Sequence, residues 1–159
     1  MSVGPERRRV QKVVGYVVSD GRLLVFTHDD FPLEVTGVQV PAGTIESGEQ
    51  PAAAVAREVW EETGVDVRIV RALGVEQYDM WPSKPELHER YFFQLAPRGD
   101  SLAERWRAGE ELPSDGGAPQ WWTCQWIPLE QAHVLCNGFG ARLGEIILGA
   151  SDGTTVEGG

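Results

Sequence analysis

The sequence predicts an α+β or α/β fold, with a mixed sheet covered by helices on both sides. Two observations favour this class. Short valine-rich or aromatic stretches that alternate like strands recur along the chain, and one clear helical stretch interrupts them after Pro51. The chain has 159 residues, of which 42% are hydrophobic, and this suits a single globular domain. We expect the domain at residues 10–150, between flexible segments at 1–9 and 151–159.

The chain is expected to open with a β-hairpin. Valine dominates the stretch from Val10 to Val18, and Leu23 to Phe26 is apolar again. Asp20-Gly21 between two such runs is a strong hairpin signal, because both residues tolerate the left-handed backbone of a tight turn. A loop at 28–32 and a short strand from Val35 to Val40 are expected next.

A helix is expected to begin at Pro51 and to end before Gly64. Proline suits the first helical position because its missing N–H is not needed there, and glycine readily takes the left-handed conformation that ends a helix. Between them, one stripe recurs at three- to four-residue spacing and is predicted to be buried: Ala52, Val55, Val59 and Thr63.

The remaining side of this helix is crowded with charge from Arg57, Glu58, Glu61 and Glu62. Like charges one turn apart destabilise a helix by roughly 0.2–0.5 kcal/mol per pair. The glutamates are therefore expected to face a cation.

Three further strands are expected after the helix, at Val65 to Val75, Glu89 to Leu95 and Trp121 to Ile127. Two connections between them are predicted to be loops. One is Tyr78 to Glu86, which carries aromatic residues and prolines, and the other is the polar, glycine-rich stretch from Pro97 to Pro119.

Helical structure is expected at three more places. The first is a helical turn at Leu102 to Arg107 within the long polar stretch. The other two are short helices near the C-terminus, at Pro128 to Leu135 and Ala141 to Leu148, where apolar residues recur with a helical period.

The formal net charge of −10 argues against a nucleic acid held on a broad basic surface, because such binding needs many Lys and Arg side chains. We therefore expect no stable nucleic-acid partner. No apolar run approaches the roughly 20 residues needed to cross a bilayer, so we expect no membrane partner either. Cys124 and Cys136 are expected to be small packing residues in the reducing cytoplasm, not a disulfide or a zinc site.

The segment from Gly43 to Val65 resembles the complete signature of the Nudix hydrolase superfamily. Gly43, Glu49 and the run Arg57 to Val65, with the letters REVWEETGV, fill its defined positions. The surrounding order of elements is similar too, so the resemblance covers most of residues 10–148. It implies an α/β/α sandwich with a mixed sheet, and hydrolysis of a nucleoside diphosphate linked to another group with Mg²⁺ or Mn²⁺.

The resemblance also implies roles for individual residues. Glu58 and Glu62 are expected to be the main metal ligands, with Glu61 as a further ligand and the backbone carbonyl of Ala42 completing the shell. These are hard oxygen donors of the kind that Mg²⁺ prefers.

Arg57 and Glu49 are expected to support the metal ligands. The arginine would orient a glutamate through a bidentate contact, and Glu49 would buttress that geometry. For the general base, relatives use either the helix or a loop before the last strand. In this chain that loop offers Glu110 or Glu111, and Gln120 stands where many relatives place a glutamate.

Aromatic side chains are candidates to stack on a nucleobase, namely Phe31, Tyr78, Trp81 and Trp122. The tryptophans placed within predicted elements are expected in the core instead: Trp60, Trp121 and Trp126. His88 and His133 show no partner pattern and are expected at the surface or already hydrogen-bonded.

The function that follows is hydrolysis of a pyrophosphate bond in a nucleoside diphosphate derivative. A nucleotide sugar such as ADP-ribose is favoured, because Pro82 lies near where ADP-ribose-hydrolysing relatives carry a proline. A nucleoside triphosphate or oxidised nucleotide competes with it, and RNA decapping is disfavoured by the acidic charge. The alternative is a noncatalytic Nudix-like module that senses such a nucleotide. A homodimer is compatible with the resemblance.

Overall fold

The computed structural model describes residues 6–29, 37–99, 102–110, 116–136 and 138–148. The predicted tail at 151–159 lies outside these residues, and so does part of the predicted strand from Val35 to Val40. In the described part of that strand, Val38 and Gln39 form only isolated bridges, to Leu135 and Phe26.

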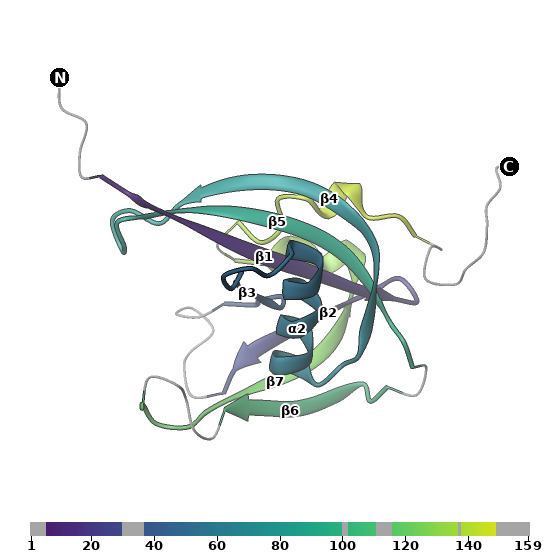
Figure 1. Ribbon diagram of the computed structural model, residues 1–159. Helices are drawn as coiled ribbons and strands as arrows, with labels where there is room; N and C mark the ends of the chain where they lie inside the picture. The colour runs from purple at the N-terminus through teal and green to yellow at the C-terminus, as the bar shows by residue number, and fades with distance from the viewer. Residues whose placement is uncertain (1–5, 30–36, 100–101, 111–115, 137, 149–159) are drawn as a thin grey trace, which may run out of the picture.

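In the described residues, the fold is a mixed sheet of seven strands with an α-helix, α2, lying across it (Figure 1). The strands are β1 (Arg8–Ser19), β2 (Arg22–His28), β3 (Ala42–Thr44), β4 (Val67–Asp79), β5 (Glu86–Pro97), β6 (Arg105–Glu110) and β7 (Gln120–Pro128). Their order is β4-β5-β1-β2-β7-β6, and β3 pairs with β1. The β1–β5 pair is parallel and the others are antiparallel, so the predicted mixed sheet is confirmed.

The long strand β1 connects the parts of this sheet. It begins at Arg8, earlier than the expected Val10, and pairs with β5 from Arg8 to Val17. Its middle pairs with β3, and its end pairs with β2 across the turn. The hairpin prediction is confirmed, because Asp20 and Gly21 both have positive φ, at 53° and 73°.

Helix α2 (Pro51–Thr63) begins at the predicted proline and ends at Gly64, whose φ is 75°. Its buried residues are Ala54, Val55, Val59 and Thr63. Ala52 was wrongly predicted to be buried. It is exposed because the stripe continues through Ala54 in the first turn instead.

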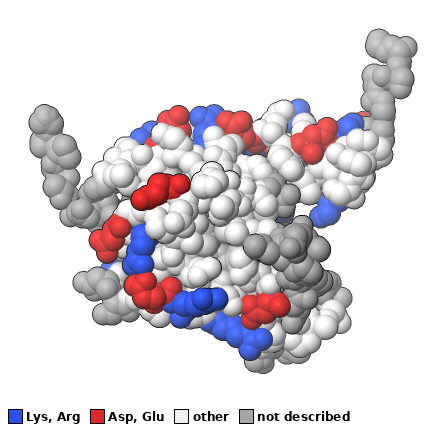
Figure 2. Space-filling view, turned by 180° about the vertical axis from the view of Figure 1, so that it is seen from behind, with Lys and Arg blue, Asp and Glu red and all other residues white. Residues whose placement is uncertain are grey.

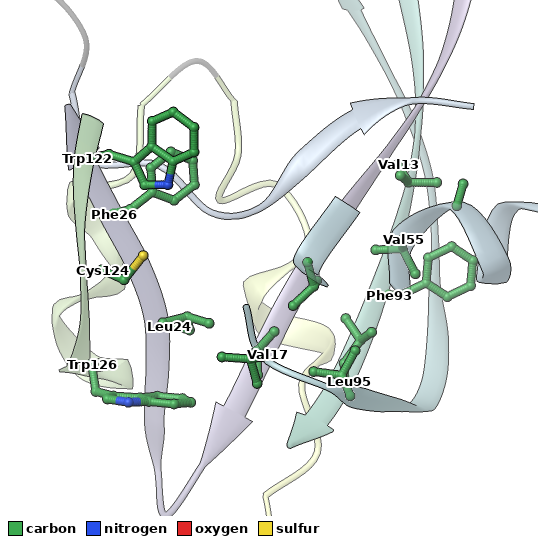
Figure 3. Close-up of a cluster of buried hydrophobic side chains, with 14 residues drawn as sticks. Val13, Val17, Leu24, Phe26, Val55, Phe93, Leu95, Trp122, Cys124 and Trp126 are labelled. Carbon is green, nitrogen blue, oxygen red and sulfur yellow. The ribbon is translucent and has the colours of Figure 1, made fainter. Parts of the chain in front are cut away.

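The helix packs against β1 at Gly15. A β-carbon on this glycine would lie 3.0 Å from a methyl group of Val55 and 3.1 Å from one of Leu95, so glycine allows the close approach. In Figure 3, side chains of β2 and β7 such as Leu24 and Trp126 point toward Val17 of β1, which closes one continuous core.

The opposite face of the sheet is covered by 3₁₀ segments, η1 (Leu129–Val134) and η2 (Leu143–Glu145) (Figure 1). The short helices predicted at Pro128 to Leu135 and Ala141 to Leu148 are therefore present as 3₁₀ helices and not as α-helices, and the second is much shorter than predicted. Each apolar stretch is shorter than the roughly 12 residues that stabilise an isolated helix, and the second contains Gly144. The α+β class with layers on both faces still holds.

Two loop predictions were also wrong. Instead of a helical turn at Leu102 to Arg107, the chain forms β6, which pairs with β7. Trp106 and Ala108 alternate along β6 and pack on the core. Strand β4 continues to Asp79, so Tyr78 lies in a strand and not in a loop.

The cysteines are free, with Cys124 buried and Cys136 partly buried. Burial raises the pKa of the Cys124 thiol to about 12, so this residue packs as a neutral side chain, as expected. Across the described residues, no helix is long and apolar enough to span a bilayer.

Two indole groups fix the C-terminal end of α2. Trp122 donates from Nε1 to the carbonyl of Glu62 at 2.7 Å, and Trp106 donates to the carbonyl of Thr63 at 2.8 Å. The last carbonyls of a helix have no partner within the helix, so these bonds satisfy them. Trp122 is thus buried and structural, and the prediction that it stacks on a base was wrong.

We expect Trp122→Phe to lower the free energy of unfolding by about 1–2 kcal/mol, because the Glu62 carbonyl loses its buried donor. Urea unfolding at neutral pH measures this change. Trp121→Phe is the matched control, since Trp121 is less buried and contacts Arg107 through its ring. Equal losses in the two variants would contradict the assignment.

Candidate active site

The centre of the site is the approach of Glu58 on α2 to the backbone of β3. A β-carbon at Gly43 would overlap the Glu58 carboxylate, so only glycine leaves room for this side chain. Gly43 pairs with Val13 of β1, and α2 packs on the same strand. The position of the carboxylate is therefore fixed from both sides.

Arg57 holds the glutamates around it. Its Nε and Nη2 donate to the two carboxylate oxygens of Glu49 at 2.7 and 2.8 Å, and its Nη1 donates to Glu58 at 2.9 Å and to Glu61 at 3.2 Å. Nη2 also donates to the carbonyl of Thr44 at 3.1 Å. The hydrogen bond from Arg57 holds the pKa of Glu49 at about 2. The predicted bidentate contact is thus made with Glu49.

Glu62 lies one turn beyond Glu58 and reaches the edge of β3. The backbone N–H of Ala42 donates to its Oε1 at 3.0 Å. Burial raises the pKa of Glu62 well above its usual range, and the charge of Glu58 raises it further. Burial likewise raises the pKa of Glu58. The two carboxylates therefore repel each other in a place where water screens them poorly.

This pair fits a hard divalent cation. Each carboxylate gives one oxygen to a protein donor, and within the described chain the other oxygen of each accepts no hydrogen bond. The side chains of the described residues do not form a ready-made cluster of three or more metal ligands. Mg²⁺ does not require one, because it binds through one or two carboxylates and keeps waters or substrate phosphates as its other ligands.

A cavity of about 240 Å³ opens beside Ala42 and Gly43. Its polar lining includes Lys12, His88 and Arg90, and its apolar lining includes Met80 and Phe139. Lys12 also donates to the Thr44 hydroxyl at 2.9 Å. The lysine and arginine place positive charge next to the carboxylate pair, as an anionic substrate would require.

Arg90 is held rigidly in this wall. Only 5% of it is exposed, and its guanidinium carbon lies 4.2 Å from the ring centre of Tyr78 and 4.8 Å from that of Phe139. Tyr16 donates from its hydroxyl to the carbonyl of Phe139 at 2.6 Å, and this hydrogen bond fixes the backbone at Phe139. Stacking between two rings orients a guanidinium without neutralising it.

A second hollow of about 350 Å³ shares Met80 with this cavity and is also lined by Tyr78 and Trp81. Trp81 is 44% exposed, and the Arg7 guanidinium lies 5.4 Å from its ring centre. The structure thus brings the predicted substrate residues Tyr78 and Trp81 together in the lining of one hollow. Phe31 and Glu111, also predicted, lie outside the described residues.

A larger cavity of about 570 Å³ lies near the β1–β2 turn, with Arg22, Arg68 and Arg98 in its lining. It contains no residue of the Gly43–Val65 motif, and Arg22 is already paired with Glu104 through two hydrogen bonds. The smaller cavity beside Gly43 is therefore the better candidate for substrate.

Several side chains differ from their predicted places. Trp60 was expected in the core but is 59% exposed, because it follows the buried Val59 on the outer side of α2. Trp126 is buried as predicted. His88 is only 4% exposed, and its Nε2 lies 2.9 Å from Oε1 of Glu86, so of the two expected alternatives it is the hydrogen-bonded one.

The sequence reasoning also missed the roles of Lys12, Arg90 and Phe139 in the cavity wall. One signal was available for two of the wall residues. His88 and Arg90 are separated by one residue in a strand, so they share a face.

Comparisons with known proteins agree with this geometry. The sequence matches the NUDIX domain family over residues 9–147. An RNA pyrophosphohydrolase of Dinoroseobacter shibae is 35% identical over 135 residues, which cover 79% of both chains. An ADP-ribose pyrophosphatase of Bacillus subtilis is 42% identical over 96 residues, which cover 50% of this chain and 52% of the relative.

Solved structures share the fold. A NUDIX hydrolase from Nitrosomonas europaea superposes with a TM-score of 0.62 at 16% identity, covering 87% of both chains. A MutT NUDIX hydrolase from Burkholderia pseudomallei gives 0.60 at 18% identity, covering 89% of this chain and 100% of the other. Since the family match spans most of the chain and includes the whole Gly43–Val65 motif, this chain belongs to the NUDIX family of hydrolases.

Proposed function

We propose that this enzyme hydrolyses a pyrophosphate bond in a nucleoside diphosphate derivative. The observation that supports the proposal is the contact of Glu58 with Gly43, because the backbone of Gly43 also lines a cavity whose wall includes Lys12 and Arg90. Positive side chains would bind the phosphates, and the carboxylates would bind the metal.

In this proposal Glu58 and Glu62 are the main ligands of Mg²⁺ or Mn²⁺, together with the backbone carbonyl of Ala42, and Glu61 either binds a second ion or holds the attacking water. The metal, when bound, would polarise a phosphoryl oxygen and acidify a bound water. Arg57 keeps Glu58 in place through its hydrogen bond, and the pairing with Glu49 keeps Arg57 in place.

The proton of the attacking water needs an acceptor. Glu61 is our candidate because 54% of its side chain is exposed, and because it lies beside Glu58 through their shared contact with Arg57. Glu111 remains a second candidate from the sequence. A kcat for Glu61→Gln that stays near wild type would shift the assignment to Glu111.

The substrate that we place first is a nucleotide sugar such as ADP-ribose, with a nucleoside triphosphate second. The second hollow, which shares Met80 with the cavity, favours a substrate that extends beyond its pyrophosphate. The relative named RNA pyrophosphohydrolase adds the 5′-triphosphate end of RNA as a third candidate. On the face seen in Figure 2, acidic and basic side chains alternate around an uncharged centre, which offers no extended track for a nucleic acid.

A panel assay tests the function directly. ADP-ribose, UDP-glucose, the nucleoside triphosphates and a 5′-triphosphorylated oligoribonucleotide are incubated with Mg²⁺ and then with Mn²⁺, and the products are resolved. We expect cleavage at a phosphoanhydride and complete loss of turnover in excess EDTA. Tight binding of a nucleotide without any cleavage would support a noncatalytic sensing module instead.

We expect Glu62→Gln to lower kcat by about 100-fold or more, which exceeds the typical effect of losing an outer partner of a metal site. Its melting temperature should be unchanged or higher, because the substitution removes a buried repulsion with Glu58. Steady-state kinetics in Mg²⁺ and thermal unfolding measure the two effects. Glu130→Gln is the control, since Glu130 is an exposed carboxylate of η1. An unchanged kcat would refute the metal site.

We expect Gly43→Ala to reduce kcat by about 10- to 100-fold, because the new methyl group displaces the Glu58 carboxylate. Gly144→Ala is the matched control, since a β-carbon there meets no atom within 4 Å. Metal titration should show weaker activation by Mg²⁺ in the first variant only. Similar kinetics for both variants would show that the close approach is not required.

We expect Trp81→Ala to raise KM about fivefold or more with little change in kcat, because base stacking on an aromatic ring contributes about 1–3 kcal/mol. Trp60→Ala is the control, since Trp60 is also exposed but lines neither hollow. An unchanged KM of Trp81→Ala for the preferred substrate would show that Trp81 does not bind the base.

A further inference from the structure

The cavity wall contains a histidine with one uncommitted nitrogen. His88 lies on β5 and lines the cavity beside Lys12, Arg90 and Met80, yet only 4% of the residue is exposed. Within the described chain, its buried Nδ1 has no hydrogen-bond partner. Buried polar atoms are nearly always satisfied, and a donor from the cavity would reach this one after a small displacement of the wall.

The other ring nitrogen fixes the tautomer. Nε2 lies 2.9 Å from Oε1 of Glu86, and Arg8 donates to Oε2 of the same carboxylate at 2.7 Å. The hydrogen bond with His88 lowers the pKa of Glu86, so the carboxylate is ionised and can only accept. Nε2 therefore carries the hydrogen, and Nδ1 of a neutral ring is left with a lone pair.

The surroundings keep the ring neutral. Burial lowers the pKa of His88, and the charges of Lys12 and Arg90 lower it further, while Glu86 opposes them. A neutral ring bonded in this way has an acceptor at Nδ1 and no donor to offer there.

This acceptor cannot serve the phosphates. Phosphate oxygens are themselves acceptors, and they suit Lys12 and Arg90, which have only donors. The groups of a nucleotide that can donate are the amino and ring N–H groups of its base and the hydroxyls of its ribose. The lining of the cavity thus offers charged donors to the phosphates, and His88 adds a neutral acceptor that suits the nucleoside.

We propose that Nδ1 of His88 accepts a hydrogen bond from an N–H or O–H donor of the nucleoside part of the substrate. His88 is then a specificity-determining residue, since a nucleotide that lacks this donor leaves the buried nitrogen unpaired. The inference rests on the proposed function only in placing the nucleotide in this cavity.

Two substitutions separate this role from a structural one. The amide of His88→Asn ends near the position of Nδ1, so it can still accept, but it loses the contact with Glu86. The amide of His88→Gln reaches the position of Nε2, so it keeps the Glu86 contact and loses the acceptor. A recognition role predicts that Asn substitutes for histidine, and a structural role predicts that Gln does.

The measurement is isothermal titration in Mg²⁺ with ADP and GDP, followed by analogues of the tighter ligand that each lack one donor. The 2′-deoxy analogue tests the ribose, and purine riboside diphosphate or inosine diphosphate tests the exocyclic amino group. We expect the wild type to bind one analogue roughly two- to tenfold more weakly. His88→Gln should lose this discrimination, and His88→Asn should keep it.

A second readout does not depend on the variants. The chain has three histidines, so the imidazole ¹⁵N resonances can be assigned readily. Adding ADP or GDP should shift the Nδ1 resonance of His88 as it accepts a hydrogen bond, while its Nε2 stays protonated.

Three outcomes would overturn the inference: equal binding of all analogues by the wild type, retained discrimination in His88→Gln, or an Nδ1 resonance that does not move. If the enzyme hydrolyses a pyrophosphate substrate but shows any of these outcomes, the recognition role of His88 is refuted and the proposed function is not. If it binds nucleotides with the expected discrimination but hydrolyses none, the proposed function is refuted and the recognition role of His88 is not.

Discussion

The approach of the Glu58 carboxylate to the backbone at Gly43 is the contact on which the rest of the site depends. It brings together a helix and a strand that are both positioned by β1. Gly43 is held there by pairing with Val13, and α2 is held there because Gly15 lets Val55 pack close. Two glycines on neighbouring strands thus set the distance between the helix and the sheet edge, and a side chain at either position would move the carboxylate.

Electrostatics then explains why the arginine alone does not neutralise the glutamates of this helix. All three nitrogens of the Arg57 guanidinium already contact Glu49, Glu58, Glu61 or the Thr44 carbonyl. No capacity remains for Glu62, whose pKa is raised by burial and by Glu58. The net charge of the whole chain does not describe this region, because Lys12 and Arg90 make the adjoining cavity wall positive.

The sequence predicted those features whose cause is local. The hairpin turn, both ends of α2 and the Gly43–Val65 motif depend on residues close together in the chain, and the structure has each of them. The errors arose where partners are distant. Strand β6 forms because β7 pairs with it, and Trp122 is buried because its indole caps a helix that lies far away in sequence. Likewise, His88 and Arg90 acquire a role only when β5 lies beside Lys12 of β1.

The two faces of strand β1 contact different parts of the proposed site. Val13, Gly15 and Val17 face α2 and hold the catalytic helix, while Lys12 and Val14 face the cavity. Because successive residues of a strand point to opposite faces, one strand positions both the helix with the proposed metal ligands and the proposed substrate cavity. On the cavity side, Tyr16 fixes the Phe139 carbonyl, and Phe139 in turn packs on Arg90. Phe139 and Arg90 are therefore held in place by contacts within the protein, so specificity at this wall would depend on which donors and acceptors a nucleotide presents to it.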